Sequence, residues 1–286
     1  MSRGYDSNVN GGTLSSTFDA IIAGTLLELT IADSSRGKPD WASQLVGKSS
    51  YLHVLDADNA VVLSGSAAMT VYDQHARYNS FETTLGLGLL HQADAAMWSL
   101  TPNLRLAWQG DALDAAGFYL DGRVQMALSA QTALIGFGKL GYTLAGPDQA
   151  LDHGVGQLGV GIEHSFDPRL TGTIQLVAER KASNTATQSV VQFGPRIGLN
   201  AQLSDSLALD IAYRYDMLFY DQTLPIFREA RSDARHDISA GLTLDLSTLT
   251  QGLEAEARYA YQNVDSTLDL HDRDRHMVTM SLRYGF

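Results

Sequence analysis

The sequence predicts an all-β fold, a transmembrane antiparallel β-barrel with 14 strands, and three observations support this prediction. Polar and apolar residues alternate along many successive stretches, as they do in strands with one apolar and one polar face. No run of about 18 apolar residues is present, which excludes membrane-spanning helices. The chain has 6 Pro but 26 Gly and 12 Tyr, a composition suited to long hydrogen-bonded ladders.

The last strand shows the alternation most clearly. Polar or small residues separate five apolar positions, which are Val278, Met280, Leu282, Tyr284 and Phe286. Two aromatic residues at the end of a strand suit the interfacial girdle of a bilayer. The strand resembles the C-terminal signal strand of Gram-negative outer-membrane β-barrels. That resemblance implies a location in the bacterial outer membrane and, as partners, the barrel-assembly machinery, outer-membrane lipids and lipopolysaccharide.

Composition narrows the class of protein further. The absence of Cys fits a cell envelope, and the net charge of −12 disfavours nucleic acid as a partner. The chain starts without the basic and apolar regions of a signal peptide. Because a barrel needs such a leader to reach the outer membrane, we expect residues 1–286 to be the barrel domain of a longer precursor.

Fourteen strands follow from the alternation, separated by turn formers such as Asp56, Asp58 and Asn59. Trp98 and Trp108 bracket about ten residues, the span of a tilted strand with an interfacial aromatic at each end. The predicted strands cover residues 3–10, 43–56, 59–73, 80–89, 98–108, 116–127, 130–144, 154–166, 169–182, 189–203, 206–220, 235–247, 252–264 and 274–286.

The predicted connections alternate in length, with short turns on the periplasmic side and longer loops outside. The short turns are at 56–59, 92–94, 128–130, 166–169, 203–206 and 247–251, and the longer loops at 11–42, 73–79, 109–115, 145–153, 183–188, 221–234 and 265–274. With 14 strands, both ends of the chain fall on the short-turn side. A count of 16 strands follows if residues 20–33 form a further hairpin of the barrel.

Charged residues fall mostly on the polar face of these strands, which predicts a wet lumen of mixed sign. An Arg on the lipid face at the midplane would cost roughly 2–4 kcal/mol, so this sorting is energetically meaningful. The luminal candidates are Arg105, Asp121, Arg123, Glu163, Arg196, Asp210, Arg214, Glu254, Glu256 and Arg258.

Two motifs resemble a nucleotide-binding site and a metal site, but their context favours a purely structural role for each. Gly154, Gly156 and Gly159 match the dinucleotide fingerprint G-x-G-x-x-G, yet they lie within a predicted strand that no helix follows. His271 and His276 flank two arginines, which repel a cation, so a solvated outer loop is the better interpretation. We therefore expect no catalytic residues, no cofactor and no metal, and we interpret the protein as a non-enzyme.

The segment 18–31 is apolar although it lies in the longest predicted outer loop. Three interpretations remain open for it. It forms an additional strand pair, a loop packed on the outside, or an inward-folded constriction that hides its apolar side chains from water.

The opening residues, Gly4-Tyr5-Asp6-Ser7-Asn8-Val9-Asn10, resemble the first barrel strand of outer-membrane proteins in which a periplasmic tetratricopeptide-repeat domain precedes the barrel. Among these, the 14-strand prediction is most similar to the surface lipoprotein assembly modifier (Slam) family. The resemblance implies a monomeric channel that exports or displays (lipo)proteins, with that protein or lipoprotein as cargo. An exopolysaccharide-export porin and a passive diffusion porin are the alternatives.

Fourteen strands enclose a backbone cylinder roughly 28 Å across, enough for an extended chain or a sugar polymer. The first strand must close the barrel against the last, yet it is short and polar, with Tyr5, Ser7 and Val9 on one face. A short strand contributes few ladder bonds, so we expect this seam to be the weakest in the wall. A weak seam would suit a lateral gate for lipidated cargo.

Overall fold

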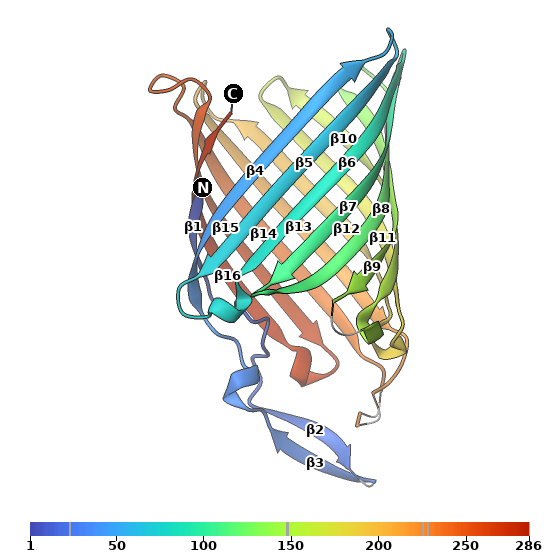
Figure 1. Ribbon diagram of the computed structural model, residues 1–286, viewed down its shortest axis with the longest axis vertical. Helices are drawn as coiled ribbons and strands as arrows, with labels where there is room; N and C mark the ends of the chain where they lie inside the picture. Colours follow the sequence, from blue (N-terminus) through green and yellow to red (C-terminus); the bar gives the residue numbers. More distant parts are fainter. Residues whose placement is uncertain (23, 147–148, 225, 228, 286) are drawn as a thin grey trace.

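The computed structural model describes residues 1–286 except 23, 147–148, 225, 228 and 286. Its described residues form a closed antiparallel barrel of 14 strands, which confirms the predicted fold class and strand number (Figure 1). The barrel strands are β1 (Ser2–Asp6), β4 (Asp40–Val54), β5 (Asn59–Tyr72), β6 (Ser80–Ala93), β7 (Ala96–Gln109), β8 (Ala112–Ala127), β9 (Thr132–Ala145), β10 (His153–Asp167), β11 (Leu170–Ser183), β12 (Val190–Gln202), β13 (Leu207–Tyr220), β14 (Ser232–Asp245), β15 (Leu253–Ser266) and β16 (Arg273–Tyr284).

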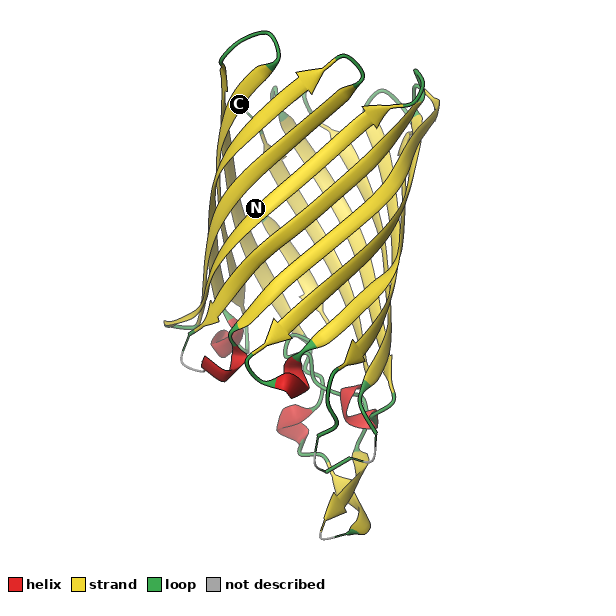
Figure 2. Ribbon diagram, turned by 90° about the vertical axis from the view of Figure 1, so that its right-hand side faces the viewer, coloured by secondary structure: helices red, strands yellow, loops and turns green. Residues whose placement is uncertain are grey.

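A separate hairpin, β2 (Thr17–Ile22) and β3 (Thr25–Thr30), accounts for the apolar segment in the first loop. The hairpin is a two-stranded sheet of its own, so the 16-strand alternative is wrong. It projects beyond the long-loop end of the barrel, so the inward constriction is wrong as well (Figures 1 and 2). Phe18 lies 6.0 Å from Phe227, centroid to centroid, and the Ile21 amide donates to the Ile226 carbonyl at 2.8 Å. These contacts with the β13–β14 loop hold the hairpin outside.

Short turns gather at one end of the barrel and longer connections at the other (Figure 1). The C-terminal end of the chain lies at the short-turn end, where the Gly285 amide donates to the Gly252 carbonyl at 3.0 Å, whereas the N-terminus lies partway along the wall. One predicted loop, 109–115, is wrong, because β7 and β8 are joined by two residues alone. Gly110 adopts φ +57°, and the register of the two strands shifts between Ala107 and Trp108. This bulge interrupts the alternation and hid the start of β8 from the sequence pattern.

The first strand ends at Asp6, four residues before its predicted end at residue 10. The Asp6 carboxylate accepts the Asn8 amide at 2.9 Å, and the Asn8 side chain accepts from and donates to Gly12, each at 2.9 Å. Such local side-chain bonds give the backbone an alternative to the ladder. The chain therefore leaves the ladder with β16 after Ser7.

Four of the longer loops share one construction. Each contains a short 3₁₀ helix, and a polar side chain beside the next strand accepts an amide from the end of the previous strand. The helices are η2 (Ala76–Tyr78), η3 (Gln149–Leu151), η4 (Ala186–Gln188) and η5 (Asp269–His271). The bonds are Tyr72 N to Asn79 Oδ1 at 2.8 Å, Ala145 N to Asp152 Oδ1 at 2.6 Å, Ser183 N to Ser189 Oγ at 2.9 Å, and Ser266 N to Asp272 Oδ1 at 2.7 Å.

The outer face of the barrel is apolar and exposed. In the last strand Val278, Met280, Leu282 and Tyr284 are between 45% and 67% exposed, whereas Phe286 lies outside the described residues. A soluble sheet would bury such a row against a second layer. An uncovered apolar belt around a closed barrel is the surface that lipid acyl chains cover. No helix among the described residues is long and apolar enough to cross a membrane.

Candidate functional site

The inner face of the barrel carries most of its charged side chains. The ten charged candidates occupy strand positions that alternate with exposed apolar residues, so they belong to the opposite, inner face. Arg105 lies on β7, Asp121 and Arg123 on β8, Glu163 on β10, Arg196 on β12, Asp210 and Arg214 on β13, and Glu254, Glu256 and Arg258 on β15. They divide into two groups, which differ in how tightly they are paired.

The inner face of β12 to β16, called here the charged arc, contains a nearly buried carboxylate. The Asp216 side chain is 2% exposed and accepts hydrogen bonds from Arg214 Nε and, at 2.6 Å, from Arg235 Nη2. Arg235 Nε also lies 3.2 Å from Asp237, whose carboxylate accepts Gln262 at 2.7 Å. Asp216 thus accepts hydrogen bonds from two arginines, while Asp237 accepts one from Gln262 and attracts Arg235 by charge.

A second group of ion pairs in the charged arc lies nearer the short turns. The Glu256 side chain, 6% exposed, pairs with Arg283 and, at 2.8 Å, with Arg258. Arg258 also reaches Asp210 on β13 at 2.9 Å, and so spans the intervening strand β14. Gly241 permits this reach, because a Cβ there would collide with the Asp210 carboxylate.

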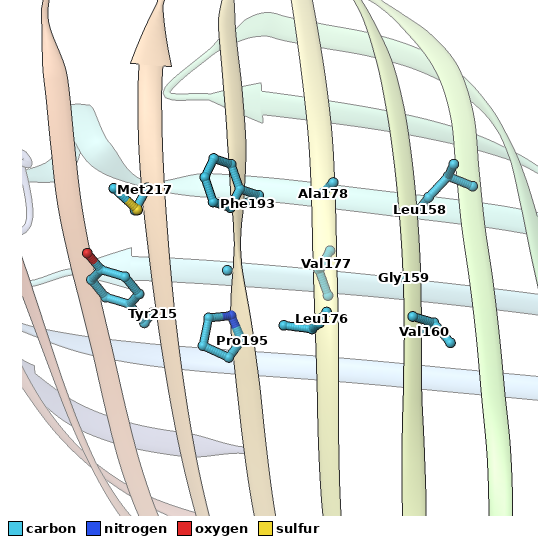
Figure 3. A pocket seen from close by; sticks show the side chains of 11 residues that line it. Leu158, Gly159, Val160, Leu176, Val177, Ala178, Phe193, Pro195, Tyr215 and Met217 are labelled. Carbon is cyan, nitrogen blue, oxygen red and sulfur yellow. The ribbon is translucent and has the colours of Figure 1, made fainter.

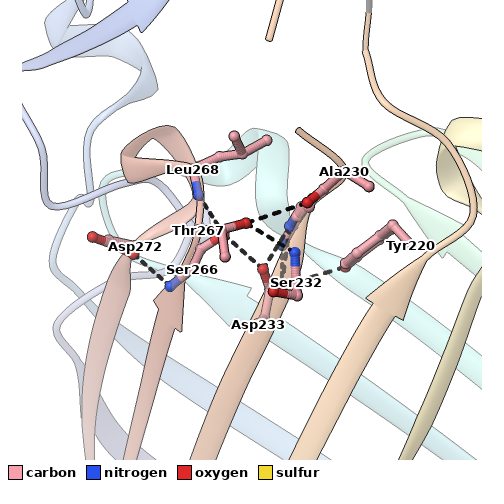
Figure 4. A network of polar contacts seen from close by, with 9 residues as sticks. Tyr220, Ala230, Ser232, Asp233, Ser266, Thr267, Leu268 and Asp272 are labelled. Carbon is pink, nitrogen blue, oxygen red and sulfur yellow. Dashed lines mark hydrogen bonds and ion pairs between the residues drawn. The ribbon is translucent and has the colours of Figure 1, made fainter. Parts of the chain in front are cut away.

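Polar contacts also join β13, β14 and β15 at the long-loop rim (Figure 4). Asp233 accepts hydrogen bonds from Arg231 Nε at 2.8 Å, Ser266 Oγ at 2.7 Å and Tyr220 Oη at 3.5 Å. His271 on the neighbouring loop faces this cluster. Burial, together with the positive charges of Arg231 and Arg273, lowers the pKa of His271 to about 4. The ring is therefore neutral at physiological pH.

Of the second group, Arg105 and Asp121 line a polar cavity of about 470 Å³ on β6 to β11, whereas Arg123 and Glu163 do not. Arg105 pairs with Glu82 at 2.6 Å, and Asp121 accepts Asn103 at 2.6 Å and lies 3.6 Å from Lys139. The side chains of these two ion pairs are between 39% and 42% exposed, far more than Asp216 or Glu256. Water screens such pairs, so they contribute little to stability.

The inner face of β5 and β6, called here the neutral arc, carries small uncharged side chains over its middle section. They are Ser64, Ser66, Ala68, Thr84, Gly86 and Gly88. These short side chains extend little into the lumen, whereas the long side chains of the charged arc extend into it from β12 to β16.

An apolar depression of about 530 Å³ lies on the outer face near Pro195 (Figure 3). Leu158, Leu176, Phe193 and Met217 line it, and they belong to the lipid-facing belt. The ladder of β12 and β13 breaks here, with Phe193 opposite Met217 and then Arg196 opposite Arg214. A proline has no amide to donate, which explains the break.

The seam residues lie partly where the sequence placed them. Tyr5 packs edge-on against Trp41 of β4, with ring centroids 5.6 Å apart. The Ser7 amide donates to the His276 carbonyl at 2.9 Å, just beyond the end of β1. Val9 lies outside the ladder, and its amide donates to the Lys38 carbonyl at 2.8 Å. The prediction of Val9 as a residue of the first strand is wrong, because the Asp6–Asn8 turn has already diverted the chain.

The glycine motif has the structural role expected for it, whereas the assignment of the two histidines to a solvated outer loop is wrong for His276. Gly154, Gly156 and Gly159 lie inside β10. His271 belongs to η5, whereas His276 lies on β16 with its ring 4.7 Å from that of Tyr261. Among the described residues, no group of three His, Asp or Glu side chains could hold a metal ion.

Several charged residues that organise the inner face escaped the sequence analysis. Arg231, Asp233, Arg235, Asp237 and Arg273 lie at the long-loop ends of β14 and β16. The prediction began β14 at residue 235 and assigned 221–234 to a loop, which hid Arg231 and Asp233. Arg235 and Asp237 sit two positions apart on one face, and this spacing was the signal available to find them.

A closed antiparallel barrel with an apolar outer belt and a charged inner face is the architecture of bacterial outer-membrane proteins. Solved structures agree. The outer-membrane channel DcaP of Acinetobacter baumannii aligns with TM-score 0.54 and 7% identity, over 99% of this chain and 95% of that one. A FadL homologue of Pseudomonas aeruginosa aligns with TM-score 0.53 and 11% identity, over 99% and 89%.

A loop-deletion mutant of OmpT, an outer-membrane protein of Vibrio cholerae, aligns with TM-score 0.52 and 10% identity, over 85% of this chain and 97% of that one. At such identities the likeness establishes the fold alone. The fold and its lipid-facing belt confirm the predicted outer-membrane location. No protein-family model and no curated protein matches the chain.

Proposed function

We propose that the protein is an outer-membrane channel that conducts hydrophilic cargo through its lumen. The observation that carries this proposal is the sorting of charge to the inner face, with ion pairs on both sides of the barrel. A wall that was merely structural would have no need of charged side chains along its whole inner height. The apolar belt supports outer-membrane lipids and lipopolysaccharide as surroundings, and the alternating last strand supports the barrel-assembly machinery as the partner for insertion.

Conductance in planar bilayers tests the channel. The purified barrel is expected to give stable ion currents, since a polar lumen with small side chains on the neutral arc leaves a continuous wet path. The hairpin β2–β3 lies beyond the rim, so deleting residues 17–30 should leave the current nearly unchanged. A barrel that inserts correctly but carries no current contradicts the proposal.

A specific observation favours one finer function, the export or surface display of (lipo)proteins by a Slam-like route. Strand β1 pairs over five positions with β16 and five with β4, whereas the other strand pairs of the barrel match over 11 to 14 positions. Fewer ladder bonds make this seam the place where the wall opens at least cost. A lateral opening would release lipidated cargo into the membrane, which neither a polysaccharide exporter nor a diffusion porin requires.

Cross-linking the seam tests the lateral opening. Ser2 lies opposite Ser281, so cysteines at both positions would lock β1 to β16. A matched control is the pair Ser239 and Ala260, which locks β14 to β15 away from the seam. Loss of lipoprotein display with the first pair, restored by reductant and absent with the control, is the expected result. Undiminished display with a fully locked seam leaves the lumen as the only route and favours the polysaccharide or porin alternative.

A further inference from the structure

One part of the charged arc holds more arginines than carboxylates. One register row of the sheet contains Arg196 on β12, opposite Arg214 on β13, which is opposite Asp237 on β14. The adjacent row contains Asp216 opposite Arg235, and it continues through Val264 to Arg273 on β16. We call Arg196, Arg214, Arg235 and Arg273 the arginine patch.

The two carboxylates within the patch are already engaged. Asp216 takes hydrogen bonds from Arg214 and Arg235, and Asp237 takes Gln262 while lying beside Arg235. Four guanidinium groups therefore face two carboxylates. Directly opposed like charges repel each other on a sheet, yet Arg196 and Arg214 are register partners.

Arg196 and Arg273 remain without a carboxylate partner in the described part of the chain. The Nε atom of each is buried and donates no hydrogen bond to any described residue. A buried guanidinium donor without an acceptor is costly, more so than a neutral one. Both groups therefore have unused capacity to bind an anion.

The groups around the patch leave its charge positive. Glu179 on β11 is within electrostatic reach of Arg196, but its carboxylate also accepts Gln157 at 2.6 Å. On the side of Arg273, Arg231 and Asp233 pair with each other, and Tyr220 lies close by. His271 faces Arg231 and Asp233 as a neutral ring. A positive patch thus lies inside a protein whose net charge is −12.

We propose that the arginine patch is a binding site for an oxyanion, the carboxylate or phosphate group of an anionic solute that enters the lumen from the long-loop end. The planar guanidinium fork matches both groups and binds them through paired hydrogen bonds. Arg273 lies at the long-loop mouth of the lumen, beside Arg231 and Asp233. Arg196 lies halfway along β12, so the patch extends inward from the mouth. The site goes beyond the proposed channel, because it binds its ligand whether or not the barrel conducts.

Calorimetric titration of the detergent-solubilised protein at low ionic strength tests the site, with inorganic phosphate and acetate as separate probes. We expect saturable binding of at least one probe, and the preferred probe identifies the group. Arg196→Gln and Arg273→Gln should each weaken that binding about tenfold, since each removes one charge-assisted contact. Arg123→Gln is the matched control, because Arg123 is an exposed inner-face arginine on β8 outside the patch.

Three outcomes overturn the proposal: no binding of either probe, binding that both patch variants retain, or an equal loss in Arg123→Gln. Circular dichroism verifies that each variant is folded, and Arg273, at the start of β16, provides a second test if Arg196→Gln does not fold. Bilayer currents recorded on the same samples report on the channel separately. Anion binding without a bilayer current would contradict the proposed channel but support the anion site. A current without anion binding would support the channel and contradict the site.

Discussion

The charged arc and the neutral arc are built on the same ladder, yet they hold the wall together in different ways. On the charged arc, side chains tie strands that are not neighbours, as Arg258 of β15 does with Asp210 of β13. On the neutral arc, short side chains leave the backbone ladder as the main link between β5 and β6. One side of the lumen therefore combines stability with charge, while the other side provides room.

Removing the most buried carboxylate should damage the charged arc most. Asp216→Asn leaves Arg214 and Arg235 without their shared anion beside Arg196. Breaking a buried ion pair in this way should lower the free energy of unfolding by about 3–5 kcal/mol. Urea titration of the protein in lipid vesicles measures the change.

Asp121→Asn is the matched control on the exposed cluster of β6 to β11, and its cost should be about 0–1 kcal/mol. Equal losses in the two variants would show that the charged arc is no more tightly coupled than the rest of the lumen.

Acidification should loosen the rim of the charged arc before the neutral arc. The pKa of His271 is lowered to about 4 in the fold, so the unfolded chain binds a proton that the folded one does not. The free energy of unfolding should therefore fall by about 3 kcal/mol as the pH drops from about 6.5 to about 4, with little further loss from this group below that.

Stability measured against pH for His271→Gln checks this assignment, because the variant should lose that part of the slope. His53→Gln, an exposed position on β4, should retain it. The rim does not depend on His271 if both variants follow the parent curve.

A methyl group at Gly241 should weaken the charged arc by less than the loss of Asp216 does. Gly241→Ala would displace Asp210 from Arg258 and lower the free energy of unfolding by about 1 kcal/mol. Gly47→Ala on β4 meets no atom within 4 Å and should be neutral or slightly stabilising. Thermal unfolding of the pair measures the difference, and no difference would mean that Asp210 finds an equivalent position.

The smallest effect is expected within the neutral arc itself. Ser66→Ala changes a short side chain on the inner face of β5 and should alter the free energy of unfolding by less than about 0.5 kcal/mol. A loss as large as that of Asp216→Asn, measured in the same urea titration, would contradict the contrast between the arcs.

The alternation of side chains predicted the fold well, because the period of two is imposed by the strand itself and the lipid penalises errors. It placed Arg196, Arg214 and Arg258 on the inner face for the same reason. The alternation could not predict the ion pairs, because the pairing of each Asp with an Arg depends on the strand register and on glycines such as Gly241. The end of β1 was missed because it is set by local bonds of Asp6 and Asn8 rather than by periodicity.

The braced outer loops have a practical consequence for labelling the cell surface. Each of the four bonds that close a loop onto the next strand would be broken by residues inserted between Tyr72 and Asn79, or at the three equivalent places. Gly24 of the β2–β3 hairpin, at φ +81°, has open space around it. An epitope tag is therefore best carried by this hairpin, where it would be displayed away from the wall and from the mouth of the lumen.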